Sequence, residues 1–253
     1  MSKAKRKKEQ AENQQGFASH LLALRSMMLR MALMVFAAFL LVFYVFNRPL
    51  VDFLLQPVVA RGVQVIATRV SESLMMQFKL SLVAGLVISM PFLNWEIWRF
   101  VGPALYPKER RAYWALLLTT ITLFFVGVAF SYLTVFPLAV NLFYEAGEGI
   151  ATSMWSVEGY FNFILSFVLP FGLMFELPVV IYLLARSGRV TAAGMGRARR
   201  YFMLGAAVAA AVLTPPDVVS QMLLLLPILL LYEISTLIAR FIKPRDRTEE
   251  AEA

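Results

Sequence analysis

The apolar run at residues 159–185 constrains the fold of this chain more than any other stretch, because Glu176 is its single charged residue. A bilayer-spanning helix needs about 20 such residues. Glu176 lies 10 residues before Arg186, roughly 15 Å along a helix, so it should lie well inside the hydrocarbon. An acid at that depth costs at least about 2.5–3.5 kcal/mol. We therefore expect Glu176 to face a packed interior or a wet cavity and to have a function.

Two interpretations of Glu176 stay open. In the simpler one, a protonated Glu176 bonds to a neighbouring helix and serves packing alone. In the functional one, the acid belongs to a binding or transport site. Gly172 is one turn earlier on the same face and is expected to leave room beside the carboxyl. Pro170 and Pro178 flank the acid and are expected to bend the helix there.

Composition places the chain among membrane proteins. Of its 253 residues 60% are hydrophobic and 16% are charged, which is more apolar than a soluble domain of this length requires. Cysteine is absent and there is one histidine, so thiol chemistry and a multi-histidine metal site are excluded. We also find no nucleophile–base set and no glycine-rich phosphate loop. The prediction is an all-α membrane protein that is not an enzyme and has no cofactor.

Six membrane spans are predicted, at residues 26–46, 74–98, 113–136, 159–185, 201–213 and 218–240. Residues 16–241 form one membrane domain, preceded by a disordered basic tail at 1–15 and followed by a second tail at 242–253. The fifth span has 13 residues, roughly 20 Å of helix against a hydrocarbon core of about 30 Å. Spans this short should thin the bilayer locally.

The distribution of basic residues predicts the orientation. Twenty Lys and Arg residues lie in the two tails and in alternate loops, against three in the opposite loops. Both termini are therefore expected in the cytoplasm, and the net charge of +8 fits anionic lipid better than nucleic acid. The remaining base, Lys79, is expected to snorkel outward. Two long outer loops, 47–73 and 137–158, are expected to form a cap.

Spans five and six should form a tight outer hairpin. Pro215 and Pro216 cannot easily continue a helix, and Asp217 can cap the next one. Gln221 either bonds to this turn or grips a partner helix, since side-chain amides are adhesive in lipid.

The inner loop at 100–111 contains the other candidate acids. Glu109 is either a helix-start acid favoured by the macrodipole or a carboxylate that pairs with an arginine of a partner. Glu96 and Arg99 are three residues apart, and a local pair on one helix face is the preferred interpretation.

Several of these segments, taken in order, resemble one known family. The most specific are Phe-Glu-Leu-Pro at 175–178 and Thr-Pro-Pro-Asp-x-x-Ser-Gln at 214–221. The other matching segments are residues 20–25, 91–100, 103–111, 136–138, 171–172 and 199–201. Together they look like TatC, the multispanning receptor of the twin-arginine protein translocase, over about residues 16 to 241.

The resemblance implies a glove- or cup-shaped bundle of six helices in the cytoplasmic (inner) membrane. It also implies a receptor that binds Arg-Arg signal peptides of folded cargo, assembles with the single-span partners TatA and TatB in a multimeric complex, and uses the proton-motive force. Glu176 would face the concave side, and Thr214 and Gln221 would dock the partners. The residues expected to read the signal are Arg25, Phe100, Leu105, Glu109 and Arg110.

Two departures from the family pattern matter. Ala23 stands where the family usually has Glu, and Trp95-Glu96 stands where it has Tyr-Gln. We hypothesise that Glu96, or Glu12 in the tail, substitutes in part for the missing acid; the alternative is a relaxed signal preference. Apart from the resemblance, the residues also allow a proton- or ion-coupled solute transporter that uses Glu176. An intramembrane enzyme ranks last, because it lacks a second catalytic group.

Overall fold

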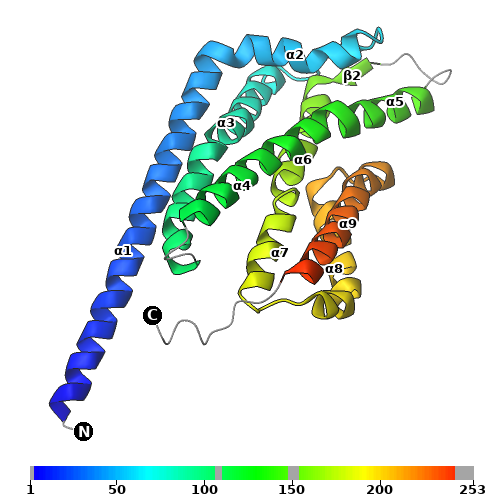
Figure 1. Ribbon diagram of the computed structural model, residues 1–253. Coiled ribbons are helices and arrows are strands. Elements are labelled where there is room, and N and C mark those ends of the chain that lie inside the picture. The colour runs from blue at the N-terminus through cyan, green and yellow to red at the C-terminus, as the bar shows by residue number, and fades with distance from the viewer. Residues whose placement is uncertain (1–2, 106–109, 148–153, 243–253) are drawn as a thin grey trace.

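The structure is a computed structural model that describes residues 3–105, 110–147 and 154–242, with side chains described from residue 22 onward except at 101–105 and 110. In order along the chain, its elements are α1 (Lys3–Leu41), η1 (Val42–Phe46), α2 (Asn47–Val59), β1 (Gln64–Ile66), α3 (Glu72–Leu105), α4 (Arg110–Phe130), η2 (Ser131–Val135), α5 (Phe136–Gly147), β2 (Met154–Ser156), α6 (Val157–Met174), α7 (Leu177–Arg186), α8 (Ala192–Leu213) and α9 (Val218–Phe241). Figure 1 shows a helical bundle with α2, β2 and α5 at one end and the α7–α8 turn at the other.

The predicted spans correspond to α1, α3, α4, the α6–α7 pair, α8 and α9. Within the described residues, five stretches are long and apolar enough to cross a membrane; α8 is not among them. The predicted fifth span, residues 201–213, is the later part of a longer helix, because α8 begins at Ala192 and has 22 residues. Its first half contains Arg197, Arg199 and Arg200, so only its second half is suited to the membrane.

Two short π-helical segments connect spans to the end of the bundle that is predicted to face outward. This end is called the outer end, and the opposite one the inner end. The segment η1 lies between α1 and α2, and η2 lies between α4 and α5. A π-helical turn changes the direction of a helix without ending it, and α2 runs across the bundle end where α1 stops (Figure 1). At the other end, α1 begins at Lys3 and continues without a break, so no helix break marks the predicted domain boundary at residue 16.

The two long outer loops are joined to each other. Strands β1 and β2 pair in parallel, with Val65 opposite Trp155. The Glu72 carboxylate reinforces this junction: Oε1 accepts a bond from the Glu158 N–H at 2.6 Å, and Oε2 accepts one from the Arg69 N–H at 3.0 Å. These two three-residue strands form the one β-sheet in the part of the chain that the structure describes.

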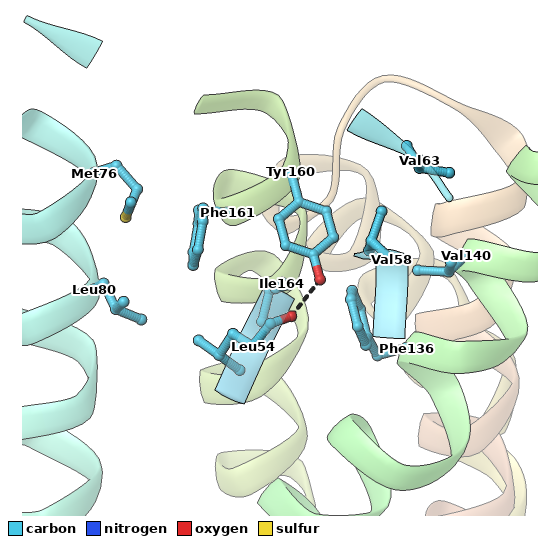
Figure 2. Close-up of a cluster of buried hydrophobic side chains, with 10 residues drawn as sticks. All are labelled: Leu54, Val58, Val63, Met76, Leu80, Phe136, Val140, Tyr160, Phe161 and Ile164. Atoms are coloured by element: carbon cyan, nitrogen blue, oxygen red, sulfur yellow. Dashed lines mark hydrogen bonds between the residues drawn. The ribbon is translucent and has the colours of Figure 1, made fainter. Parts of the chain in front are cut away.

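A buried apolar cluster lies under this junction and holds the outer end on the bundle (Figure 2). Its members come from α2, α3, α5 and α6, together with Val63 beside β1: Leu54, Val58, Val63, Met76, Leu80, Phe136, Val140, Tyr160, Phe161 and Ile164. The Tyr160 hydroxyl donates to the Leu54 carbonyl, which satisfies a polar group inside this cluster.

Helices α8 and α9 form a closely packed hairpin. Asp217 is the N-cap residue of α9, and its Oδ1 accepts the Ser220 N–H at 2.7 Å. Ala206 and Ala210 of α8 are buried in one cluster with Leu224 and Ile228 of α9. Small residues on one helix let the neighbouring backbone approach closely, so the hairpin is compact.

Candidate functional site

Glu176 lies at an interruption between two helices. Helix α6 ends at Met174 and α7 begins at Leu177, so the predicted bend is a break of two residues. Pro178 explains it, because a proline ring collides with the carbonyl four residues earlier, here that of Met174. The Glu176 N–H bonds to the Leu173 carbonyl at 3.1 Å, and the Glu176 carbonyl accepts the Val179 N–H at 3.0 Å.

The Glu176 side chain turns toward α3. It is half-buried, and its Oε1 accepts a hydrogen bond from Asn94 Nδ2 at 3.2 Å. Asn94 is itself 3% exposed. One oxygen of the acid therefore contacts a buried amide. Sequence reasoning missed Asn94, although a polar side chain in the middle of a predicted span is a signal that could have found it.

Gly172 does not leave room for the carboxyl, contrary to the expectation. A Cβ on Gly172 would lie 2.5 Å from Cε2 of Phe124 on α4, so the glycine makes space for that ring. Gly127 of α4 has the matching role, because its Cβ would lie 2.5 Å from the Phe171 carbonyl oxygen. The two glycines allow α4 and α6 to pack at close range just before the Glu176 break.

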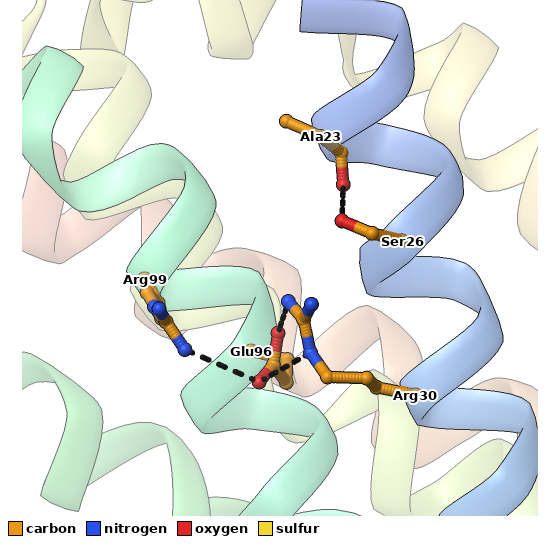
Figure 3. Close-up of polar contacts among 5 residues, drawn as sticks. All are labelled: Ala23, Ser26, Arg30, Glu96 and Arg99. Atoms are coloured by element: carbon orange, nitrogen blue, oxygen red, sulfur yellow. Dashed lines mark hydrogen bonds and ion pairs between the residues drawn. The ribbon is translucent and has the colours of Figure 1, made fainter.

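Glu96 pairs with the expected Arg99 and, more closely, with a second arginine from α1. Arg30 of α1 donates from Nε to Oε1 at 3.2 Å and from Nη2 to Oε2 at 2.6 Å, whereas Arg99 Nη1 lies 3.8 Å from Oε1. Figure 3 shows the two guanidinium groups on either side of the carboxylate. The preferred local pair is thus the weaker of two contacts, because helix packing brings Arg30 directly opposite Glu96.

The bidentate Arg30–Glu96 contact argues against the hypothesis that Glu96 substitutes for the acid missing at Ala23. Ala23 lies two turns before Arg30 on α1, and Ser26 Oγ donates to the Ala23 carbonyl at 2.8 Å. An arginine arriving from outside would have to displace Arg30 from Glu96. Charge-assisted bidentate pairs are among the stronger hydrogen bonds, so the geometry does not favour the substitution.

The remaining signal-reading candidates are only partly described. Arg25 is exposed on α1, and Phe100 is exposed on α3. Leu105 and Arg110 belong to α3 and α4, but their side chains lie outside the description. Glu109 lies outside the described residues, as does the side chain of Glu12.

The two partner-docking candidates are engaged within the chain. Thr214 is buried, and its hydroxyl donates to the Ala210 carbonyl at 2.8 Å. Gln221 Nε2 donates to the Ala207 carbonyl of α8 at 3.1 Å. Gln221 therefore links α9 to α8, whereas Thr214 caps the end of α8. Pro215 and Pro216 lie in the turn between the two helices. Lys79 does not simply snorkel: its Nζ donates to Asn162 Oδ1 at 3.1 Å.

An apolar hollow of about 460 Å³ lies in the outer half of the bundle. Its walls come from η1, α2, α3, α4, η2 and α6, and include Val87 of α3 and Val168 of α6. Val168 precedes Glu176 by eight residues, roughly 12 Å of helix. The hollow and the acid thus lie at different depths of the same wall.

Comparison with known proteins gives one consistent match. The sequence model of the family described as Sec-independent protein translocase protein (TatC) matches residues 19–227. The chain is 37% identical to the Sec-independent protein translocase protein TatC of Escherichia coli K12 over 94% of this chain and 93% of that one. It is 36% identical to the protein of the same name from Haemophilus influenzae, over 93% of each chain.

Two solved structures are also similar. One, described as the crystal structure of the twin arginine translocase receptor TatC, superposes with a TM-score of 0.80 at 36% identity, covering 87% of this chain and 97% of that one. A second crystal structure of the same receptor, in DDM, gives a TM-score of 0.81 at 35% identity, covering 88% of this chain and all of the other.

Proposed function

This chain belongs to the TatC family of Sec-independent protein translocase proteins, and from that premise we propose that it is the signal-receptor and core subunit of a twin-arginine translocase. It is a multi-pass membrane protein with six spanning helices in a cup-shaped bundle, and it is a component of a protein translocase. Binding of Arg-Arg signal peptides and assembly with single-span partners are the finer parts of the proposal.

The observation that supports this function best is the match of sequence and fold over nearly the whole chain. The solute-transporter alternative rested on Glu176 alone. Its support falls away, because the family is one of protein translocation and the acid is bonded to Asn94 within the bundle.

Signal binding is proposed at the end of the bundle where α3 meets α4. Glu109 takes a signal arginine by charge-assisted hydrogen bonds, and Arg25, Phe100, Leu105 and Arg110 shape its surroundings. The apolar part of the signal then lies against the inner wall of the cup near Glu176. The apolar hollow along η1, α3 and α6 offers further surface of the matching chemistry.

Partner helices are proposed to dock along α8 and α9. The part of α8 that is suited to the membrane is short, and short spans thin the bilayer around them. Within the hairpin, Thr214 caps α8 and Gln221 bonds α9 to α8. The docking surface itself is then formed by exposed apolar neighbours such as Val212 and Val218.

The proposal also includes the location of the chain in an inner membrane, its orientation there and the energy source for transport. The excess of Lys and Arg on one side supports cytoplasmic N- and C-termini in an inner membrane. The proton-motive force drives transport.

The test is export of a twin-arginine reporter in cells that lack their own TatC and receive this chain. Restored export that depends on both signal arginines and on single-span partners is the expected result. Export of a signal with both arginines replaced by glutamine, at the same level, would contradict the receptor assignment. So would uptake of a small solute by the purified chain alone.

A further inference from the structure

A second hollow, of about 270 Å³, lies where α1 meets α3 at the inner end of the bundle. Its α1 wall consists of Ala23, Ser26, Met27 and Arg30, and its α3 wall consists of Glu96, Arg99 and Phe100. Figure 3 shows most of these residues together. The lining combines a carboxylate, two guanidinium groups, a hydroxyl and apolar side chains.

Positive charge exceeds negative charge in this hollow. The Glu96 carboxylate is shared by Arg30, at 2.6 Å, and Arg99, at 3.8 Å. A guanidinium group has five N–H donors, and Arg30 uses Nε and Nη2 on Glu96. Donors on both arginines are therefore left for a further acceptor.

The charges are also arranged by depth. The Glu96 side chain is 6% exposed, whereas those of Arg30 and Arg99 are 45% and 67% exposed. The carboxylate thus forms the floor of the hollow and the guanidinium groups form its mouth. An approaching group meets positive charge first, so the hollow suits an anion and disfavours a cation.

The hollow lies at the level of lipid headgroups. Arg30 is followed by residues 31–46, and none of these 16 residues is charged. They form roughly 24 Å of helix, which is most of a hydrocarbon core of about 30 Å. Arg30 therefore lies close to the membrane boundary. On α3, residues 80–95, which precede Glu96, also carry no charge, so Glu96 and Arg99 lie at the same level as Arg30.

An exposed apolar track leads from the hollow into the membrane. Leu33 and Met34 follow Arg30 by three and four positions on α1, and therefore share its face. Their side chains are 71% and 39% exposed. A free phosphate ion would make no use of this track, whereas the acyl chain of a lipid would lie along it.

We propose that this hollow binds the headgroup of an anionic phospholipid such as phosphatidylglycerol. The phosphate oxygens accept hydrogen bonds from Arg30 and Arg99, because guanidinium groups match phosphate geometry well. An acyl chain packs on Leu33 and Met34. The bound lipid would fix the approach of α1 to α3 beside the proposed signal-reading loop, and the proposal does not depend on signal recognition itself.

The experiment uses the full chain in phosphatidylcholine nanodiscs that contain a small fraction of phosphatidylglycerol. Native mass spectrometry measures how much of each lipid stays bound. The wild type should retain phosphatidylglycerol in preference to phosphatidylcholine. Arg99→Gln should weaken that preference about fivefold, the effect of one arginine near an anionic surface, and Arg99→Lys should retain most of it. Arg99 is chosen because its loss leaves the Arg30–Glu96 pair intact.

Arg189→Gln is the matched control, since Arg189 is an exposed arginine in the α7–α8 turn at the same end of the bundle (Figure 1). It should leave the lipid preference unchanged. Equal retention of the two lipids by the wild type overturns the proposal, as does an equal loss in Arg189→Gln and Arg99→Gln. Displacement of the lipid by millimolar inorganic phosphate would assign the hollow to a soluble anion instead.

Discussion

At the scale of single residues, two partly buried polar pairs join helices in the inner half of the bundle. Asn94 holds Glu176, and Arg30 holds Glu96. Each pair joins two helices, and each gives a polar group that is expensive to bury a partner with suitable geometry. The bond to Asn94 fits both a packing role and a functional role for Glu176. The two interpretations predict different export activity when Glu176 is replaced by a neutral side chain of the same shape.

Replacing Glu176 separates those interpretations. An amide at this position keeps a hydrogen bond to Asn94 and removes the acid, so Glu176→Gln should fold normally and still lose most export if the acid itself is needed. Glu176→Ala should impair export as well, while inserting into the membrane. Reporter export and membrane levels measure both. Full export by the two variants would reduce Glu176 to a packing residue.

Glu109 is the proposed acceptor of a signal arginine. Glu109→Ala removes a charge-assisted pair, so an Arg-Arg peptide should bind roughly ten- to a hundredfold more weakly, given about 1.5–3 kcal/mol for a hydrogen bond to a charged group. Peptide binding to the purified chain in nanodiscs measures the effect. Glu145→Ala, at an exposed position on α5, is the control. Unchanged affinity for Glu109→Ala would remove this residue from the site.

At the scale of elements, close helix contacts place the Glu176 break. The glycines of α4 and α6 bring these helices together beside Phe124 and Phe171, and Pro178 separates α6 from α7 at the next turn. The α4–α6 contact fixes the end of α6, and the helix break at Pro178 separates α7 from it. Glu176 lies at this break, and its side chain reaches Asn94 on α3. The site thus depends on helix contacts that involve no charged residue.

Gly172→Ala tests this contact. The new methyl group would meet the Phe124 ring at 2.5 Å, and overpacking of this kind costs about 1–3 kcal/mol. Thermal unfolding in detergent should show a lower Tm, and Phe124→Leu in the same chain should restore part of it. Gly205→Ala on α8 is the control, because a Cβ there meets nothing within 4 Å. An equal Tm for the two alanine variants would argue against the contact.

At the scale of the whole molecule, the outer junction makes the bundle one body. It joins the loop before α3 to the start of α6 through β1, β2 and Glu72. The apolar cluster beneath it packs α2, α3, α5 and α6 together (Figure 2). Without these contacts the helices could separate from one another. The outer junction therefore helps to hold the helices in place at the inner end of the bundle as well.

Glu72→Gln should loosen this junction. The amide retains one acceptor oxygen, whereas the carboxylate offers two oxygens to the N–H groups of Thr68, Arg69 and Glu158. Hydrogen exchange should therefore quicken at these amides and in β1 and β2. Exchange in the α8–α9 hairpin should not change, because it packs on Phe167 and Phe171 of α6, which lie more than two helical turns beyond Glu158. Unaltered exchange at Glu158 would show that Glu72 does not hold the junction.

The sequence by itself determined the number of spans, the short fifth span, the hairpin turn at Pro215 and Pro216, and the presence of one acid, Glu176, within the fourth span. These follow from local rules: apolar length, proline chemistry and the cost of a buried charge. Tertiary structure alone decided the partners, because they come from distant parts of the chain. The pairs Arg30–Glu96, Asn94–Glu176 and Glu72–Glu158 span 66, 82 and 86 residues. Helix periodicity relates residues three or four apart, so only the packing of whole helices could bring such pairs together.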